Sequence, residues 1–121
     1  MGVDERFRPR DRLRRRAEFD NVFASGTASS DSLLTVYVVG NGLAWSRLGI
    51  VTGKKVGNAP RRNLVRRRLR EAFRKNRSAL PVGFDIVCVA RAAAGAHGAP
   101  VADSVTRLAT LAARRSTKRV Y

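Results

Sequence analysis

Arginine and lysine side chains gather in one segment of the chain, residues 54–77. This segment holds eleven Lys or Arg residues and a single acid, Glu71. Guanidinium groups carry a planar fork of N–H donors that matches the oxygens of a phosphate. A charge run is more often a solvated helix face, but such a face usually intersperses acids, which are nearly absent here. The segment therefore favours contact with nucleic acid.

Helical periodicity divides this segment into two faces. Asn58 is placed to cap a helix that has Pro60 in its first turn and runs to about residue 78. The apolar positions share one stripe, which should face the core: Val65, Leu69, Ala72 and Phe73. A neighbouring sector holds Asn63, Arg66, Arg67, Arg70, Arg74 and Arg77. Like charges at i and i+4 repel one another, and a bound polyanion would neutralise that repulsion.

Two lysines precede this helix. Lys54 and Lys55 lie in a Gly-bounded turn that follows a predicted strand. The first N–H groups of a helix lack intrahelical partners and attract anions. We therefore expect both lysines to add phosphate contacts beside the helix N-terminus.

The other chemistry-bearing residues form no catalytic set. The nine acids make no compact cluster such as a two-metal nuclease needs. The one histidine, His97, stands in a Gly/Ala loop without a paired nucleophile. The one cysteine, Cys88, excludes an internal disulfide and suits a buried strand position. We predict neither a catalytic residue nor a metal ligand on the protein itself.

Composition narrows the class of partner. The net charge of +16 points to nucleic acid, an anionic membrane surface or an acidic protein. Most of the basic residues are Arg, which stacks on bases as well as binding phosphate. No apolar run reaches the roughly 20 residues that span a bilayer, and the charged N-terminus lacks the apolar region of a secretory signal. We expect a cytoplasmic protein with no membrane partner.

The hydrophobic pattern predicts three helices and three strands, with a weaker fourth strand. Phe19, Val22 and Phe23, at i, i+3 and i+4, predict a first helix that ends at Ser25 and Gly26. Strands are expected over residues 33–39, 47–51 and 84–90, with short extended structure around 27–30. The short connection between residues 39 and 47 contains glycine and predicts an antiparallel hairpin. A last amphipathic helix begins near Val101.

The 121 residues fit one domain, whose 44% hydrophobic residues can bury a small core. We expect residues 1–11 to be a flexible basic arm, residues 12–115 the folded core and residues 116–121 a frayed tail. No internal repeat or long linker divides the chain.

The basic segment also carries a family resemblance. The run Lys54-Lys-Val-Gly-Asn-Ala-Pro-Arg-Arg-Asn-Leu-Val-Arg-Arg-Arg-Leu-Arg-Glu-Ala-Phe73 resembles the signature of the bacterial ribonuclease P protein component. The matching positions are Val56, Ala59, Arg62, Asn63, Val65, Arg66, Arg67, Leu69 and Arg70. Leu64 departs from the third residue of the family's Arg-Asn-Arg core, which is often basic. Residues 12–26, 48–55 and 84–91 resemble the family's first helix and two of its strands, in the family's order.

The resemblance implies a fold. It is a two-layer α/β sandwich with a four-stranded sheet and the order α-β-β-β-α-β-α, similar to domain two of ribosomal protein S-five. The basic helix would lie in a left-handed crossover between parallel strands, against the usual right-handed rule. Sequence patterning alone does not give that hand.

The resemblance also implies a non-catalytic protein subunit of ribonuclease P (RNase P). In the family, a catalytic RNA removes the 5′ leader from precursor tRNA, and Mg²⁺ bound mainly by that RNA activates a water. The implied contacts with the catalytic RNA are Lys54, Lys55, Arg62, Asn63, Arg66, Arg67, Arg70 and Arg74. The expected partners are this RNA and precursor tRNA, with no obligate protein partner.

A second surface is implied between the first helix and the sheet, where the family holds the single-stranded leader. Phe19, Phe23 and Tyr37 match its aromatic positions. Aromatic rings stack on bases with little sequence demand, worth roughly 1–3 kcal/mol per base. The spacing of Phe23 with Phe19 and Val22 also fits a core stripe. Trp45 has no assigned role.

Three other functions stay open on the sequence. A structural ribosomal protein is also small, basic and RNA-bound, and it would cosediment with ribosomal subunits. A DNA-binding regulator would need a helix-turn-helix, whereas strands flank this basic helix. A standalone protein nuclease would cleave precursor tRNA without an RNA partner.

Overall fold

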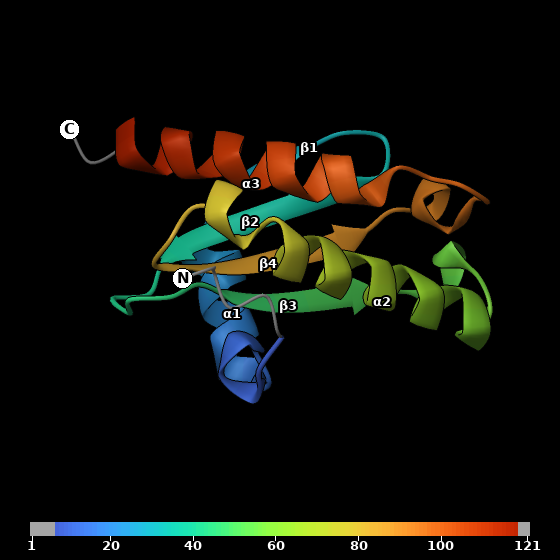
Figure 1. Cartoon of the computed structure of the whole chain (residues 1–121), viewed down its shortest axis with the longest axis horizontal. Coiled ribbons are helices and arrows are strands. Elements are labelled where there is room, and N and C mark those ends of the chain that lie inside the picture. Colours follow the sequence, from blue (N-terminus) through green and yellow to red (C-terminus); the bar gives the residue numbers. More distant parts are fainter. Residues whose placement is uncertain (1–6, 119–121) are drawn as a thin grey trace.

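The computed structural model describes residues 7–118 and contains a four-stranded sheet with helices on both faces (Figure 1). The helices and strands are α1 Arg16–Ser25, β1 Thr27–Ser30, β2 Leu34–Gly40, β3 Arg47–Thr52, α2 Ala59–Lys75, β4 Phe84–Ala90 and α3 Val101–Lys118. Single turns of 3₁₀-helix connect them: η1 Pro9–Asp11, η2 Lys54–Val56, η3 Arg77–Ala79 and η4 Ala92–Gly95. The predicted order of helices and strands is confirmed. None of the helices in residues 7–118 is long and apolar enough to span a bilayer.

β4 lies at the centre of the sheet, whose strand order is β1-β2-β4-β3. It runs antiparallel to β2 and parallel to β3, so Cys88 stands between Val36 and Ile50. The predicted hairpin between residues 33–39 and 47–51 is therefore wrong, because β4 separates these two strands. A strand that is apolar on both faces, as β4 is, takes an interior position. The actual hairpin joins β1 and β2.

The parallel pairing of β3 with β4 requires a crossover connection, and α2 supplies it. This is the β-α-β unit that the family resemblance implies. Its left hand stays a prediction.

α2 and α3 cover one face of the sheet (Figure 1). Alternate residues of β2 (Leu34, Val36 and Val38) are fully buried against these two helices. The apolar stripe predicted for the basic helix is confirmed, since all four of its residues are buried. Each such Leu or Phe contributes roughly 1.5–3 kcal/mol. Cys88 is also buried here as predicted, and burial raises the pKa of its thiol to about 12.

α1 lies on the opposite face of the sheet, behind β2 and β4 in Figure 1. Val22 is fully buried there against Leu13 and Val87. The helix spans only 10 residues and covers part of this face, so Phe23 and Val51 stay 41% and 38% exposed. The partly open face is where the aromatic positions lie.

Residues 7–13, called the strap below, run along the outer edge of β3. Arg12 bridges to Leu48 in parallel, and the Leu13 N–H donates to the Leu48 carbonyl at 3.0 Å. Asp11 is fully buried and accepts hydrogen bonds from Nη1 and Nη2 of Arg77 at 3.2 and 3.0 Å. The predicted flexible arm is therefore wrong for residues 7–11. Residues 1–6 lie outside the described part of the chain.

The predicted frayed tail, residues 116–121, is partly helical in the structure. Residues 116–118 continue α3, whose apolar face is docked on the sheet. Residues 119–121 lie outside the described part of the chain.

We predict that Asp11→Ala lowers the free energy of unfolding by about 2–3 kcal/mol, because two hydrogen bonds to a charged, buried group are lost. Asp20→Ala removes the same charge from a side chain that is 67% exposed and 3.9 Å from Arg16, and it should cost less than about 0.5 kcal/mol. Urea unfolding of the two variants measures the difference. Equal losses would show that Asp11 has no special structural role.

Candidate RNA interface

The arginine face of α2 comprises Arg62, Asn63, Arg66, Arg67, Arg70 and Arg74. It lies beside the buried stripe, with Asn63 and Arg67 exposed and the other four half-buried. Nη1 of Arg66 donates to Oδ1 of Asn63 at 2.9 Å. The Nε of Arg62 is buried and has no hydrogen-bond partner among the described residues. The structure thus brings the six predicted α2 residues together.

Carboxylates do not neutralise this face. Within residues 7–118, the ion pairs are Asp11–Arg77, Glu18–Arg47, Asp85–Arg47, Asp31–Arg107 and Asp20–Arg16. Arg77, which the helical wheel placed in the same sector, is therefore held by Asp11. Desolvation lowers the pKa of Arg70, and the positive charges of Arg12 and Arg66 lower it further. The face is an array of cations with no carboxylate of residues 7–118 within ion-pair distance.

The two predicted lysines precede the N-terminus of α2. Lys54 and Lys55 form η2 and are exposed. Gly57 then takes a φ of 146°, a region that favours glycine, and turns the chain into the helix. Oδ1 of Asn58 accepts from the Arg61 N–H at 3.1 Å, which confirms Asn58 as the N-cap.

The aromatic surface, Phe19, Phe23 and Tyr37, lies on the other side of the sheet. The rings of Phe23 and Tyr37 meet edge to face, with centroids 5.0 Å apart. Phe19 lies over Gly49 of β3, where a Cβ atom would stand 2.6 Å from its ring. Of the α1 stripe, Val22 is the core residue while Phe23 remains exposed. The structure therefore groups all three predicted aromatic residues on one face.

An ion-pair network fixes the N-terminus of α1, and sequence reasoning missed it. Oε1 of Glu18 accepts the backbone N–H groups of Arg14 and Arg15 at 3.1 and 3.0 Å. Its Oε2 accepts from Arg47, which also binds Asp85 bidentately at 2.8 and 2.7 Å. The Arg15 N–H is the largest cause that lowers the pKa of Glu18; burial opposes it, and Arg14 and Arg47 add to the lowering. The network ties the helix that carries Phe19 to the sheet.

Trp45, to which the sequence assigned no role, holds the strap. Its Nε1 donates to the Arg10 carbonyl at 3.0 Å, and the Arg10 guanidinium lies 4.8 Å from the ring centroid. His97 is an exposed turn residue, as predicted. Within residues 7–118, no three His, Cys, Asp or Glu side chains lie close enough together to hold a metal ion.

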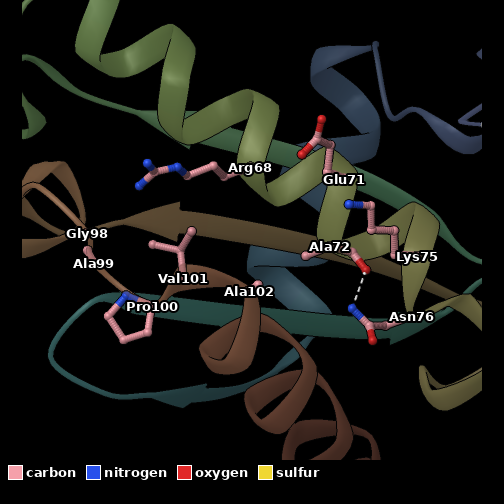
Figure 2. A pocket seen from close by; sticks show the side chains of 10 residues that line it. All are labelled: Arg68, Glu71, Ala72, Lys75, Asn76, Gly98, Ala99, Pro100, Val101 and Ala102. Carbon is pink, nitrogen blue, oxygen red and sulfur yellow. Dashed lines mark hydrogen bonds between the residues drawn. The ribbon is translucent and has the colours of Figure 1, made fainter.

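A groove of about 360 Å³ lies between α2 and the start of α3 (Figure 2). Arg68, Lys75 and Glu71 line it, and the amide of Asn76 donates to the Ala72 carbonyl at 2.9 Å. None of the predicted site residues contributes to it. Because its charged side chains carry both signs, it is a poorer polyanion surface than the arginine face.

Fold and surface chemistry together define a small α/β protein that presents a polycationic helix on one side and aromatic rings on the other. Residues 7–114 match the family model described as ribonuclease P. The chain belongs to the bacterial ribonuclease P protein component family, so the resemblance is confirmed.

Relatives and solved structures agree with this assignment. The ribonuclease P protein component of Thermotoga petrophila is 45% identical over 89 residues, which cover 74% of this chain and 76% of that protein. The RNase P protein of Thermotoga maritima has a TM-score of 0.72 at 35% identity, covering 80% of this chain and 96% of that chain. The Staphylococcus aureus RNase P protein has a TM-score of 0.76 at 29% identity, covering 84% and 94%.

We predict that Glu18→Gln lowers the free energy of unfolding by about 1 kcal/mol at pH 7, because the ion pair with Arg47 is lost. The folded state lowers the pKa of Glu18 below its ordinary 4.5, so the carboxylate stabilises the fold above that value. Its contribution disappears as the pH falls through the lowered pKa. Urea unfolding between pH 7 and pH 3 should show the stability of Glu18→Gln and that of the unchanged protein converging in acid. Asp20→Asn is the control. A difference between Glu18→Gln and the unchanged protein that widens in acid would contradict the prediction.

Proposed function

We propose that this chain binds the catalytic RNA of RNase P through the arginine face and the 5′ leader of precursor tRNA through the aromatic surface. One observation carries the proposal: no described carboxylate pairs with any arginine of the arginine face. A folded protein bears such a concentration of like charge more readily when a polyanion binds there.

The catalytic RNA suits the arginine face for geometric reasons. A helix of 17 residues presents its arginines at regular intervals, as a phosphate backbone presents its charges. Exposed Lys54 and Lys55 extend the cationic surface past the N-terminus of α2.

The leader suits the aromatic surface because the rings are accessible and held on rigid elements. Phe23 is 41% exposed, and Tyr37 is half-buried on the adjoining strand. Stacking tolerates any base, as leaders of varied sequence require. Since only the substrate has a leader, these contacts would hold precursor tRNA more tightly than mature tRNA.

The protein would thus act by binding energy and leave the chemistry to the RNA. Most of its described carboxylates are engaged with arginines and do not fit a metal site of their own. The RNA partner would hold the Mg²⁺, whose chemistry is activation of the attacking water. The cationic protein would take over part of the screening of phosphate repulsion that Mg²⁺ otherwise supplies.

Reconstitution tests this function. Adding the protein to the cognate catalytic RNA should raise cleavage of precursor tRNA at low Mg²⁺ and have less effect at high Mg²⁺. Single-turnover rates across a Mg²⁺ titration measure the shift. Cleavage that stays unchanged at low Mg²⁺ refutes the proposal, and stable cosedimentation with ribosomal subunits would favour the structural ribosomal alternative.

We predict that Arg66→Ala plus Arg70→Ala flattens the dependence of RNA affinity on salt. Each lost phosphate contact removes about 0.7–0.9 from the slope of log K against log salt, so the double variant should lose about 1.4–1.8. Arg114→Ala plus Arg115→Ala removes equal charge from exposed positions on α3 and is the control. An identical slope for both variants would remove Arg66 and Arg70 from the interface.

A further inference from the structure

A cavity of about 140 Å³ lies where the strap, the start of α1, β3 and α2 meet. Three arginines line it from two distant parts of the sequence: Arg12 from the strap, and Arg66 and Arg70 from successive turns of α2. Phe19 forms another part of its wall. The cavity therefore borders both the arginine face and the aromatic surface.

The charges around this cavity are unbalanced. Among residues 7–118, no acid lines it and no carboxylate pairs with its three arginines. Their proximity shows in the pKa of Arg70, which burial lowers first and the charges of Arg12 and Arg66 lower further. Like charges in a partly desolvated cavity destabilise the unliganded protein.

The strap places charges of opposite sign beside Arg77, which follows α2, and beside Arg70, which lies within α2. It supplies Asp11 to Arg77, which is thereby neutralised in a buried ion pair. One residue later it supplies Arg12, a further cation, to the cavity of Arg70. A purely structural packing would gain from an acid at the second place as well. The arrangement is suited to an anion that comes from outside the chain.

The size of the cavity admits a phosphate. A water molecule needs about 10–15 Å³ of such cavity volume, so about 140 Å³ leaves room for a group of several heavy atoms. Guanidinium forks bind phosphate oxygens in pairs, and three of them can surround one tetrahedral group. The ring of Phe19 is placed to contact the adjoining base or ribose.

We propose that Arg12, Arg66 and Arg70 form a site for one phosphodiester of a bound RNA strand, at the junction of the two RNA-binding surfaces. The site rests on the proposed function for the identity of its ligand. The phosphodiester belongs either to the leader or to the catalytic RNA, and both present the same chemistry. Arg12, which lies outside the basic helix, becomes an RNA-binding residue.

Inorganic phosphate probes the site directly. In a titration of the full chain, phosphate should shift the NMR signals of the Phe19 ring and of the Nε–H groups of Arg66 and Arg70. Arg12→Ala should raise the apparent Kd for phosphate in this titration about tenfold, as expected for the loss of a hydrogen-bonded charge contact. Arg14→Ala is the matched control, because Arg14 is exposed and does not line the cavity. Equal responses in the two variants, or no shift at Phe19, overturn the proposal.

Two RNA arms identify the source of the phosphate. Affinities of both variants are measured for a single-stranded leader oligonucleotide and, separately, for the catalytic RNA. The RNA that Arg12→Ala binds about tenfold more weakly than Arg14→Ala does is the one that supplies the bound phosphodiester. Arg12→Lys keeps the charge without the fork and should recover part of the loss, which also guards against misfolding of the alanine variant.

The proposal and the proposed function fail separately. Phe23→Leu alters the aromatic surface outside the cavity. If Phe23→Leu weakens leader binding while Arg12→Ala matches Arg14→Ala in both arms, the phosphate site is refuted and the function stands. If the protein binds neither RNA and does not lower the Mg²⁺ requirement, the proposed function is refuted, whatever the cavity does with inorganic phosphate.

Discussion

The position of β4 between β2 and β3 determines where both candidate RNA surfaces lie. Because β4 is parallel to β3, the chain must leave the sheet after β3, cross one face and return, and α2 is that crossing. The burial of Val65 and Leu69 then fixes the rotation of α2 and turns its arginines outward. α3 completes that layer, so the other face is left to the shorter α1 and stays partly open.

The protein divides its charges between structure and binding. Two of its acids hold partly buried arginines: Asp85 pairs with Arg47, and Asp11 pairs with Arg77. Removing one partner of such a pair leaves the other charge partly buried and uncompensated, which destabilises the fold. No carboxylate within residues 7–118 forms an ion pair with an arginine of α2. α2 alone carries eight of the 25 Lys and Arg residues of the chain and only one acid.

Periodicity in the sequence predicted the parts that depend on local pattern. Residues 84–90 and 27–30 are strands as expected, and the buried and cationic sides of α2 followed from the helical wheel. Pairing between strands is not local, so the short connection before Arg47 wrongly predicted a hairpin. The same limit hid the contact of Arg12 with the cavity of Arg70 and the network that joins Glu18 to Asp85. No spacing rule relates residues so far apart.

Both candidate surfaces are built on regular elements that tertiary contacts hold rigid. Phe19 is placed by α1, which Glu18 anchors to the sheet through Arg47, and Gly49 leaves the space that its ring occupies. The arginine face is fixed by the buried stripe of the same helix. Side chains that are already positioned lose less conformational entropy on binding, so more of each contact appears as affinity. The proposed function relies on binding energy alone, so it requires side chains that are already held in place before the RNA binds.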